Sequence, residues 1–388
     1  MKASAFVYPW DVNGDPRAPE RIAGLGVEQV TLAAAYHSTR ALTPRHPRHR
    51  IVTAEHAAVL YPADQRRWEG RTPRPYPAGD WALGDAYGEA ADALAAAGLE
   101  VHTWVVLAHN SRLGAEHPAT SVVNAYGDRY PWAPCVAQPA TRAYLVDLAA
   151  EAAVRPGARG TELESLGWYG LQHLHAHDKT SGVGLGEAGQ YLMALCFCPA
   201  CREGYAEEGL DADELAASVR AALEPLWQGA AAADDGGWAG VEKLLGGETA
   251  AATRAWRDRT ARTLQEDAVA AVRAAAPEGF QVLLHADPVS YHCGANPGVD
   301  PAHILSVADG VVVPCAGGTE PLVPFAEQGR AGAVIAANFT VVSGMGGSPG
   351  TLAADAARAR ALGATELRLY HAGLASDGDL AAVREALR

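Results

Sequence analysis

The feature that most constrains this 388-residue chain is an alternation of short apolar runs with longer, alanine-rich amphipathic stretches. Strands that alternate with helices pair in parallel through right-handed crossovers. Eight such units close into a (β/α)8 TIM barrel, which is the fold class we predict. The expected strands are Ala5–Pro9, Gln29–Ala34, Val101–Leu107, Thr161–Leu166, Gln281–Ala286, Gly310–Pro314, Ala333–Ala337 and Glu366–Tyr370.

The amphipathic stretches between these runs predict the helical layer. A doubly wound open sheet is the alternative fold, but no Gly-x-Gly-x-x-Gly motif follows the first strand as a dinucleotide-binding sheet would require. The expected helices are Asp85–Ala97, Pro139–Val154, Thr253–Ala276, Pro321–Gly329, Thr351–Leu362 and Leu380–Leu387.

Two connections are much longer than the rest. We expect residues 1–388 to form a single barrel domain, with a loop excursion at residues 36–80 and an insertion at residues 168–252. The insertion contains a cysteine cluster and a helical stretch at Ala212–Leu226. Both long loops follow strands of the barrel, and the carboxyl ends of barrel strands are where such enzymes build their sites.

Composition excludes several classes of partner. A formal net charge of −14 makes nucleic acid and anionic membrane surfaces poor partners. The chain has no apolar run of the length of a membrane span and no secretory signal at its start, so we expect a cytoplasmic protein. A homo-oligomer is compatible with this composition, and nothing in the sequence indicates an organic cofactor.

Four cysteines are spaced as ligands of a structural zinc ion. Cys196, Cys198 and Cys201 offer three thiolates within six residues. Tetrahedral zinc needs a fourth ligand, and Cys135 follows the neighbouring strand on the same face of the barrel. Four thiolates leave no open coordination position, so the ion would join two loops without taking part in catalysis. The alternative is that these are ordinary buried thiols.

These motifs resemble the family 42 glycoside hydrolases, which are β-galactosidases with a barrel and a four-cysteine zinc site. The resemblance extends from about Val101 to Tyr205 and includes a Glu at the end of strand four, followed by residues 195–202, Leu-Cys-Phe-Cys-Pro-Ala-Cys-Arg. It implies a glycosidase that acts on a small carbohydrate. Barrel proteins related to glycoside hydrolases are also similar across Trp104–Ala150.

Strand four carries two glutamates on one face. Side chains alternate across a strand, so Glu162 and Glu164 both point into the barrel. Arg368 on strand eight also points inward, and we expect it to neutralise Glu162 or Glu366, because an unpaired buried charge is costly. Glu164 is then free for chemistry, although a paired lumen carboxylate is the alternative. By resemblance it lies where family 42 has its acid/base, with Leu163 in place of the preceding Asn.

Glycosidic cleavage usually needs a second carboxylate. Family 42 has its nucleophile at the end of strand seven, where this chain has Ala337 and Asn338. The candidates for this role are Asp287 after strand five and Glu320 after strand six. Each also has a structural interpretation, since both acids precede a proline at the start of a turn or helix.

Residues 173–179 form the densest polar cluster. His173, His175 and His177 would share one face of an extended loop, followed by Asp178 and Lys179. They could bind sugar hydroxyls, hold a catalytic metal, or remain a solvated loop. Further substrate-binding candidates stand at strand ends: Trp10, Asp11, Tyr36, His37, His109, Asn110, Trp168, His285, Asn338 and Tyr370.

The loop between Tyr36 and Pro77 is basic, with eight arginines against Glu55, Asp64 and Glu69. It could cover an anionic sugar or pair with acidic surface elsewhere. The sequence therefore predicts a glycoside hydrolase that cleaves a small glycoside or oligosaccharide. The alternatives are a metal-dependent barrel isomerase, lyase or hydrolase that uses the histidine cluster, and a non-catalytic sugar-binding barrel.

Overall fold

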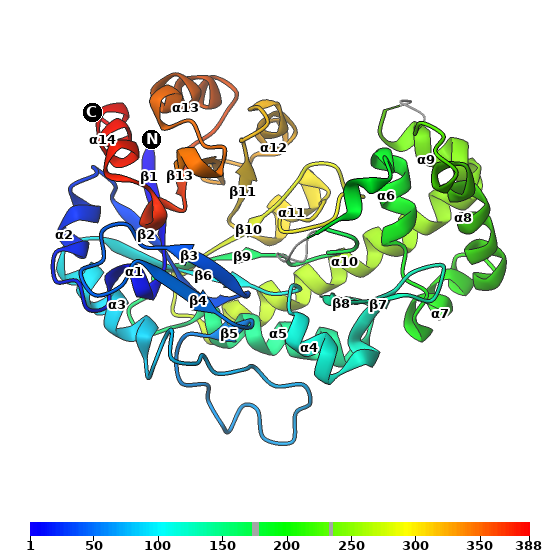
Figure 1. The fold of residues 1–388 in the computed structure, drawn as a ribbon, viewed down its shortest axis with the longest axis horizontal. Helices are drawn as coiled ribbons and strands as arrows, with labels where there is room; N and C mark the ends of the chain where they lie inside the picture. Colours follow the sequence, from blue (N-terminus) through cyan, green and yellow to red (C-terminus); the bar gives the residue numbers. More distant parts are fainter. Residues whose placement is uncertain (173–177, 233–235) are drawn as a thin grey trace.

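The computed structural model describes residues 1–172, 178–232 and 236–388. Eight parallel strands form a closed barrel, in which β1 pairs with both β2 and β13 (Figure 1). The predicted TIM-barrel class is therefore confirmed. The barrel strands are β1 (Lys2–Val7), β2 (Gln29–Tyr36), β6 (Glu100–Val106), β9 (Gly160–Glu164), β10 (Gln281–His285), β11 (Gly310–Pro314), β12 (Val334–Thr340) and β13 (Glu366–Tyr370).

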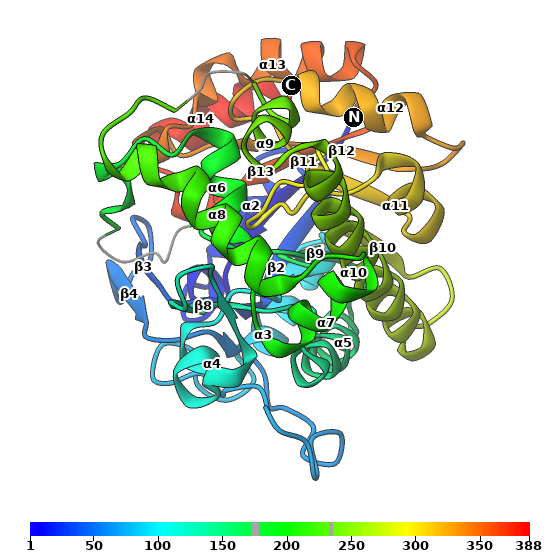
Figure 2. The ribbon, with the colours of Figure 1, turned by 90° about the vertical axis from the view of Figure 1, so that its right-hand side faces the viewer.

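Helices surround the barrel and cover the outward-facing side chains of its strands (Figures 1 and 2). The sequence analysis did not predict α2 or α11, which are only six and seven residues long and therefore have little periodicity to detect. The helices of this layer are α2 (Ala18–Ala23), α3 (Ala86–Ala96), α5 (Pro139–Ala153), α10 (Gly247–Ala275), α11 (Pro301–Val307), α12 (Val323–Gln328), α13 (Leu352–Ala361) and α14 (Asp377–Ala386).

The insertion forms a lobe at one side of the barrel, at the right of Figure 1 and facing the viewer in Figure 2. The lobe combines four helices of the insertion, which follow β9, with a hairpin that follows β6 and precedes the insertion in the sequence. Residues of this lobe share one apolar core cluster with the barrel's outer layer. Its elements are β7 (Ser121–Val123), β8 (Arg129–Pro134), α6 (Gly186–Ala194), α7 (Pro199–Glu207), α8 (Ala212–Trp227) and α9 (Trp238–Leu245), and the short α4 (Ser111–Glu116) precedes the hairpin.

The excursion after β2 is more ordered than its sequence indicates. A hairpin of β3 (Thr39–Leu42) and β4 (Ile51–Ala54) leads to β5 (Ala58–Val59), which pairs antiparallel with β2. The short α1 (Pro9–Val12) follows β1. Among the described residues, no helix has the length and apolar character needed to cross a bilayer.

Strand β9 ends earlier than predicted, at Glu164 instead of Leu166. Ser165 has a φ of 57°, in the left-handed region that side chains disfavour. Its N–H donates to the carbonyl of Ala295 in the loop after β10, at 2.8 Å. The chain therefore leaves the ladder directly after Glu164 and fixes this side chain at the end of the strand.

Candidate active site

The lower layer of the barrel lumen is an ion-pair network centred on Arg368. Its Nε donates to Glu162 Oε1 at 2.6 Å, and its Nη1 donates to Glu366 Oε2 at 2.8 Å. Burial alone would raise the pKa of Glu162, but the charge of Arg368 and a contact with His285 lower it to about 2. The predicted neutralisation by Arg368 is confirmed for both glutamates.

Glu164 lies one layer higher, and none of the described arginines or lysines is within ion-pair distance of it. Its Oε2 accepts a hydrogen bond from Trp104 Nε1 at 2.7 Å and from the Tyr370 hydroxyl at 3.5 Å. His285 Nδ1 is 3.8 Å from the same oxygen. Burial raises the pKa of Glu164, and these three neighbours only partly oppose that shift. The result is a carboxyl group that retains its proton at higher pH than an exposed glutamate.

Aromatic rings surround Glu164. Trp104 packs edge-to-face on Phe6 with centroids 4.7 Å apart and on Tyr36 at 4.6 Å. Tyr8 stacks on Trp10 at 4.6 Å and donates a hydrogen bond to the Tyr36 hydroxyl. These rings form a separate apolar cluster inside the barrel, distinct from the one between strands and helices. Flat apolar walls around a few polar groups are typical of small-molecule sites.

His371 adds a second unusual backbone position at the rim. It follows β13 directly and has a φ of 61°. Ser165 after Glu164 and His371 after Tyr370 thus both have a left-handed backbone at the carboxyl end of a barrel strand. The ring of His371 packs on Tyr370 with centroids 3.8 Å apart and its Nδ1 is 3.0 Å from the Tyr8 hydroxyl. Such conformations cluster at functional sites.

Trp104, Tyr169 and His371 lie at the candidate site and are not among the residues predicted from the sequence. Trp104 is two residues from the polar His102 on β6, so strand alternation places both side chains on the same face. This alternation could have identified Trp104 from the sequence. Tyr169 stacks on His109 with ring centroids 4.2 Å apart, whereas the residue predicted at this point of the chain is its neighbour Trp168. His371 directly follows the predicted end of strand eight. Its position at the carboxyl end of a barrel strand, where functional residues gather, is the one sequence signal for it.

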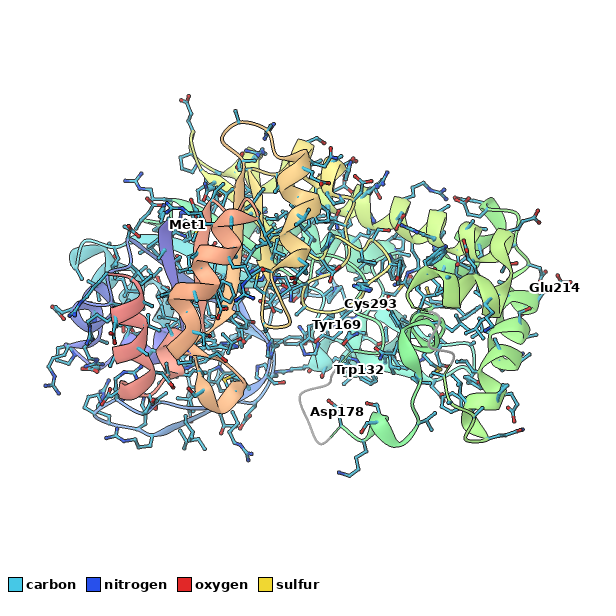
Figure 3. The ribbon with its side chains drawn as sticks, turned by 90° about the horizontal axis from the view of Figure 1, so that it is seen from above. Met1, Trp132, Tyr169, Asp178, Glu214 and Cys293 are labelled. Carbon is cyan, nitrogen blue, oxygen red and sulfur yellow. The ribbon has the colours of Figure 1, made fainter. Side chains whose placement is uncertain are left out.

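The predicted substrate-binding residues separate into groups. Trp10, Tyr36, His285 and Tyr370 line the lumen around Glu164, and His37 stacks on Tyr36 at 4.2 Å. Asn338 on β12 is buried, and its Oδ1 has no partner among the residues described. Asp178 and Lys179 are exposed, and Figure 3 shows Asp178 on the outside of the lobe. His173, His175 and His177 lie outside the described residues.

Three of these candidates are engaged in local structure. Asp11 Oδ2 accepts from the Tyr8 N–H at 2.9 Å in the capping box of α1, and burial raises the pKa of Asp11 to about 7. Asn110 Oδ1 accepts from the N–H of Leu113 and caps α4. Trp168 faces α10, where its Nε1 donates to the carbonyl of Arg257 at 3.0 Å.

Asp287 and Glu320 occupy different cavities. Asp287 Oδ1 accepts from the N–H of Val289 at 2.8 Å and contacts His292 Nδ1 at 3.1 Å. It lines a cavity of about 340 Å³ between the loop after β10 and α6. Glu320 begins a short 3-10 helix (Glu320–Leu322) and lines a cavity of about 360 Å³ between the ends of β11 and β12. Neither acid shows a direct contact with Glu164.

Several arginines of the basic loop have partners within the protein. Arg71 Nη1 lies 3.2 Å from Asp147, and Arg67 Nη1 lies 3.9 Å from the same carboxylate. Arg45 donates to backbone carbonyls after β13, among them that of Gly373 at 2.8 Å. The arrangement favours the interpretation that this loop pairs with acidic and carbonyl groups of the barrel.

The four cysteines of the predicted metal site converge. All four are buried, and their sulfur atoms lie within 4.8 Å of one another. Cys135 Sγ is 3.6 Å from Cys198 Sγ and 3.5 Å from Cys201 Sγ. A tetrahedron with metal–sulfur bonds of about 2.3 Å requires sulfur–sulfur distances of about 3.8 Å, so the spacing fits a thiolate-bound ion.

The backbone explains how these sulfur atoms meet. Cys135 directly follows β8, Cys198 is the N-cap of α7, and Cys201 lies in the first turn of that helix. The Val123 N–H donates to Cys196 Sγ at 3.4 Å, and the Phe197 N–H bonds to the Val123 carbonyl. N–H groups directed at sulfur favour a thiolate. The cluster therefore connects the hairpin after β6 to the helices after β9.

Comparison with solved structures shows that this barrel has a fold found in glycoside hydrolases. No family model and no curated protein sequence matches the chain. The glycoside hydrolase domain of PgaB (BpsB) from Bordetella bronchiseptica matches with a TM-score of 0.59 at 15% identity, over 100% of this chain and 99% of that one. The α-L-fucosidase isoenzyme 2 from Paenibacillus thiaminolyticus gives 0.58 at 12%, over 100% and 48%.

The family named in the sequence analysis is also present among these structures. A catalytic mutant of Gan42B, a GH42 β-galactosidase from G. stearothermophilus, matches with a TM-score of 0.54 at 11% identity, over 100% of this chain and 56% of that one. The chain thus spans about half the length of the fucosidase and of this β-galactosidase. The resemblance to glycoside hydrolase barrels is confirmed for the fold, which hosts many chemistries.

Proposed function

We propose that this protein is a glycoside hydrolase in which Glu164 is the general acid. The observation that carries the proposal is the environment of this carboxyl group: it stands at the end of β9, buried among aromatic rings, with a raised pKa. Among the described residues, no arginine or lysine is in ion-pair contact with it. A general acid must hold its proton near neutral pH and lie where a leaving group can reach it. The fold that the chain shares with the glycoside hydrolases named above supports this assignment.

The surroundings of Glu164 favour a sugar as substrate. Tyr370, the partly exposed ring beside Glu164, offers a flat surface to the C–H face of a pyranose. Buried polar groups at the same end of the barrel, including Asn338, can bind hydroxyls. In the reaction, Glu164 would give its proton to the glycosidic oxygen as the bond to the anomeric carbon breaks, and Trp104 Nε1 would hold the resulting carboxylate.

We assign the second carboxylate to Asp287 in preference to Glu320. Strand β10 pairs with β9, and Asp287 is two residues beyond His285, which contacts Glu164. Glu320 follows β11, one strand further away. Asp287 would act directly as nucleophile or through a water as base, and the two roles require carboxylate separations of about 5–5.5 Å and about 6.5–9.5 Å respectively.

The test is a panel of aryl glycosides assayed with Glu164→Gln, Asp287→Asn and Glu320→Gln. We expect Glu164→Gln to lower kcat/KM by about 10²–10⁴-fold for substrates with a poor leaving group. The loss should be far smaller for dinitrophenyl glycosides, because their leaving group needs no proton. Asp287→Asn should be slow with both kinds of substrate, and Glu320→Gln is the matched control.

An unchanged rate for Glu164→Gln with poor leaving groups would contradict the proposal. A non-catalytic sugar-binding barrel is the second candidate, because Glu162, the carboxylate that shares the lumen face of β9 with Glu164, is already neutralised by Arg368. That candidate predicts that sugars raise the melting temperature without any turnover by the wild-type protein.

We further propose that the four-cysteine cluster holds zinc and that the ion stabilises the lobe. Cys135, Cys196, Cys198 and Cys201 would be its ligands, and a tetrahedral thiolate site leaves no position for substrate. Elemental analysis of the purified protein should find one equivalent of zinc, and Cys198→Ser should lose it. Removal of zinc by a chelator should lower the melting temperature. Absence of zinc from the native protein would contradict this proposal.

A further inference from the structure

Arg257 in α10 is a buried cation that has no carboxylate partner in the described part of the chain. It is 3% exposed, and no described carboxylate lies within ion-pair distance of it. Its guanidinium lies over the rings of Trp168 and Tyr191, with centroids at 4.9 and 5.0 Å, and its Nη1 donates to the Ala194 carbonyl. Its Nε has no partner among the residues that the structure describes. A buried charge in such a setting requires a counter-charge.

Cys293 is in the position of that counter-charge. Nη2 of Arg257 donates to Cys293 Sγ at 2.8 Å. Electrostatic attraction between these two groups is the leading cause that raises the pKa of Arg257 against the effect of burial. A thiolate beside a guanidinium would balance the charge of this part of the lobe, and nearby cations promote ionisation of cysteine.

Cys293 is also accessible, whereas Arg257 is not. It is half-buried in the loop after β10 and lines the cavity of about 340 Å³ that also contains Asp287 and Glu187. Figure 3 shows Cys293 near Tyr169, between the barrel and the lobe. Its sulfur lies against the backbone of Gly170: a Cβ atom placed on that glycine would be 3.2 Å from Cys293 Sγ. A small molecule in the cavity can therefore reach the sulfur.

The ionisable neighbours of this cavity do not supply the missing charge. Glu187 Oε1 accepts from His292 Nε2 at 3.0 Å, and the Nδ1 of the same imidazole contacts Asp287 at 3.1 Å. These two carboxylates raise the pKa of His292 to about 9, so they are paired with an imidazolium. Their charge is directed at His292. Asp258, which follows Arg257 in α10, is 3.6 Å from Arg254 Nε and accepts from the Ser290 hydroxyl at 3.3 Å.

The remaining cysteines have different environments. Four of them form the cluster assigned above to zinc. Cys315 is buried, its sulfur donates to the Val313 carbonyl at 3.4 Å, and burial raises the pKa of this thiol to about 12. Cys315 is therefore a control within the same chain.

We propose that Cys293 carries a thiolate paired with Arg257, and that its cavity is a covalent modification site for small uncharged electrophiles, with hydrogen peroxide as one of them. The sulfur attacks one oxygen of the peroxide and the O–O bond breaks. Cysteine is oxidised to a sulfenic acid, and the released hydroxide takes a proton from solvent to become water. This inference does not depend on the proposed glycosidase activity.

The experiment measures alkylation of the native protein by iodoacetamide at pH 7, followed residue by residue with peptide mass mapping. We expect Cys293 to react at least tenfold faster than free N-acetylcysteine and Cys315 not to react. Free cysteine is only a few per cent ionised at this pH, which leaves room for that acceleration. Peroxide should give a sulfenic acid at Cys293 that dimedone traps. A rate for Cys293 no higher than that of N-acetylcysteine would overturn the proposal.

A stability comparison tests the charge without a variant of Arg257, whose replacement can unfold the lobe. Cys293→Ser removes the negative charge and Cys293→Asp supplies one of similar size. We expect Cys293→Asp to have the higher melting temperature of the two at pH 7. The reverse order, with serine more stable than aspartate, would show that Arg257 does not need a counter-charge at this position and would overturn the proposal.

Discussion

The two layers of the barrel lumen shift the pKa of the same chemical group in opposite directions. Glu162 and Glu164 leave the same strand two residues apart, and both are buried. In the lower layer, Arg368 lowers the pKa of Glu162 to about 2. In the upper layer, burial raises the pKa of Glu164, and its closest donors are the neutral groups of Trp104 and Tyr370.

The difference shows that burial alone does not decide the state of a lumen carboxylate. The opposing strand decides it, because β13 places a guanidinium opposite Glu162 and a phenol near Glu164. A pair of acids whose environments drive their pKa values apart marks the division between structural and chemical roles. The lower layer then fixes the barrel, and the upper layer is free to exchange protons.

The largest effect should come from Arg368→Met, which removes the cation of the lower layer. Glu162 would remain buried without its partner, and breaking a buried pair in this way costs about 3–5 kcal/mol. Denaturant unfolding of the wild type and the variant measures the loss. The double variant Arg368→Met, Glu162→Gln is the control and should recover much of it. A loss below about 1 kcal/mol, the range of an exposed pair, would mean that Glu162 is solvated.

The second-largest effect should be the loss of unfolding free energy in acid as Glu162 in the lower layer becomes protonated. The folded pKa of Glu162 is about 2, below its ordinary value of 4.5, so its contribution is fully present above pH 4.5 and is lost as pH falls toward 2. Linkage gives this contribution a size of about 3 kcal/mol. Stability measured between pH 5 and pH 3 should decline more steeply for the wild type than for Glu162→Gln. Equal slopes would contradict the assigned ion pair.

The inward-facing residues of the lumen could be predicted from the sequence, because the alternation of side chains along a strand depends only on neighbouring residues. Alternation along β9 and β13 predicts which of Glu162, Glu164, Arg368 and Tyr370 point inward, and the bounds of β11 and β13 match their apolar runs. The predicted end of β9 was wrong because Ser165 leaves the ladder for a bond with Ala295, a tertiary contact that no local pattern contains.

The sites that depend on contacts between distant segments were only partly predictable. Cysteine spacing identified the cluster, because metal ligands follow a spacing rule. The pairing of Arg257 with Cys293 joins a helix to a loop 36 residues away, and neither residue stands in a motif. Asp287 was expected at the rim beside Glu164, and its contact with His292 depends on how the loop after β10 folds back on itself.

The smallest expected effect is the change in melting temperature caused by Glu164→Gln. It is also the effect that distinguishes the two layers most sharply. The folded pKa of Glu164 lies above 4.5, so ionisation costs stability as pH rises from 4.5 through that raised value. Glutamine removes this cost while its amide oxygen can still accept from Trp104 Nε1. The variant should therefore melt at a slightly higher temperature than the wild type at neutral pH and at the same temperature near pH 4. Glu162→Gln should show the opposite sign at neutral pH. If both substitutions destabilise the protein equally, Glu164 is a structural anion like Glu162, and a proton donor must be sought elsewhere in the barrel.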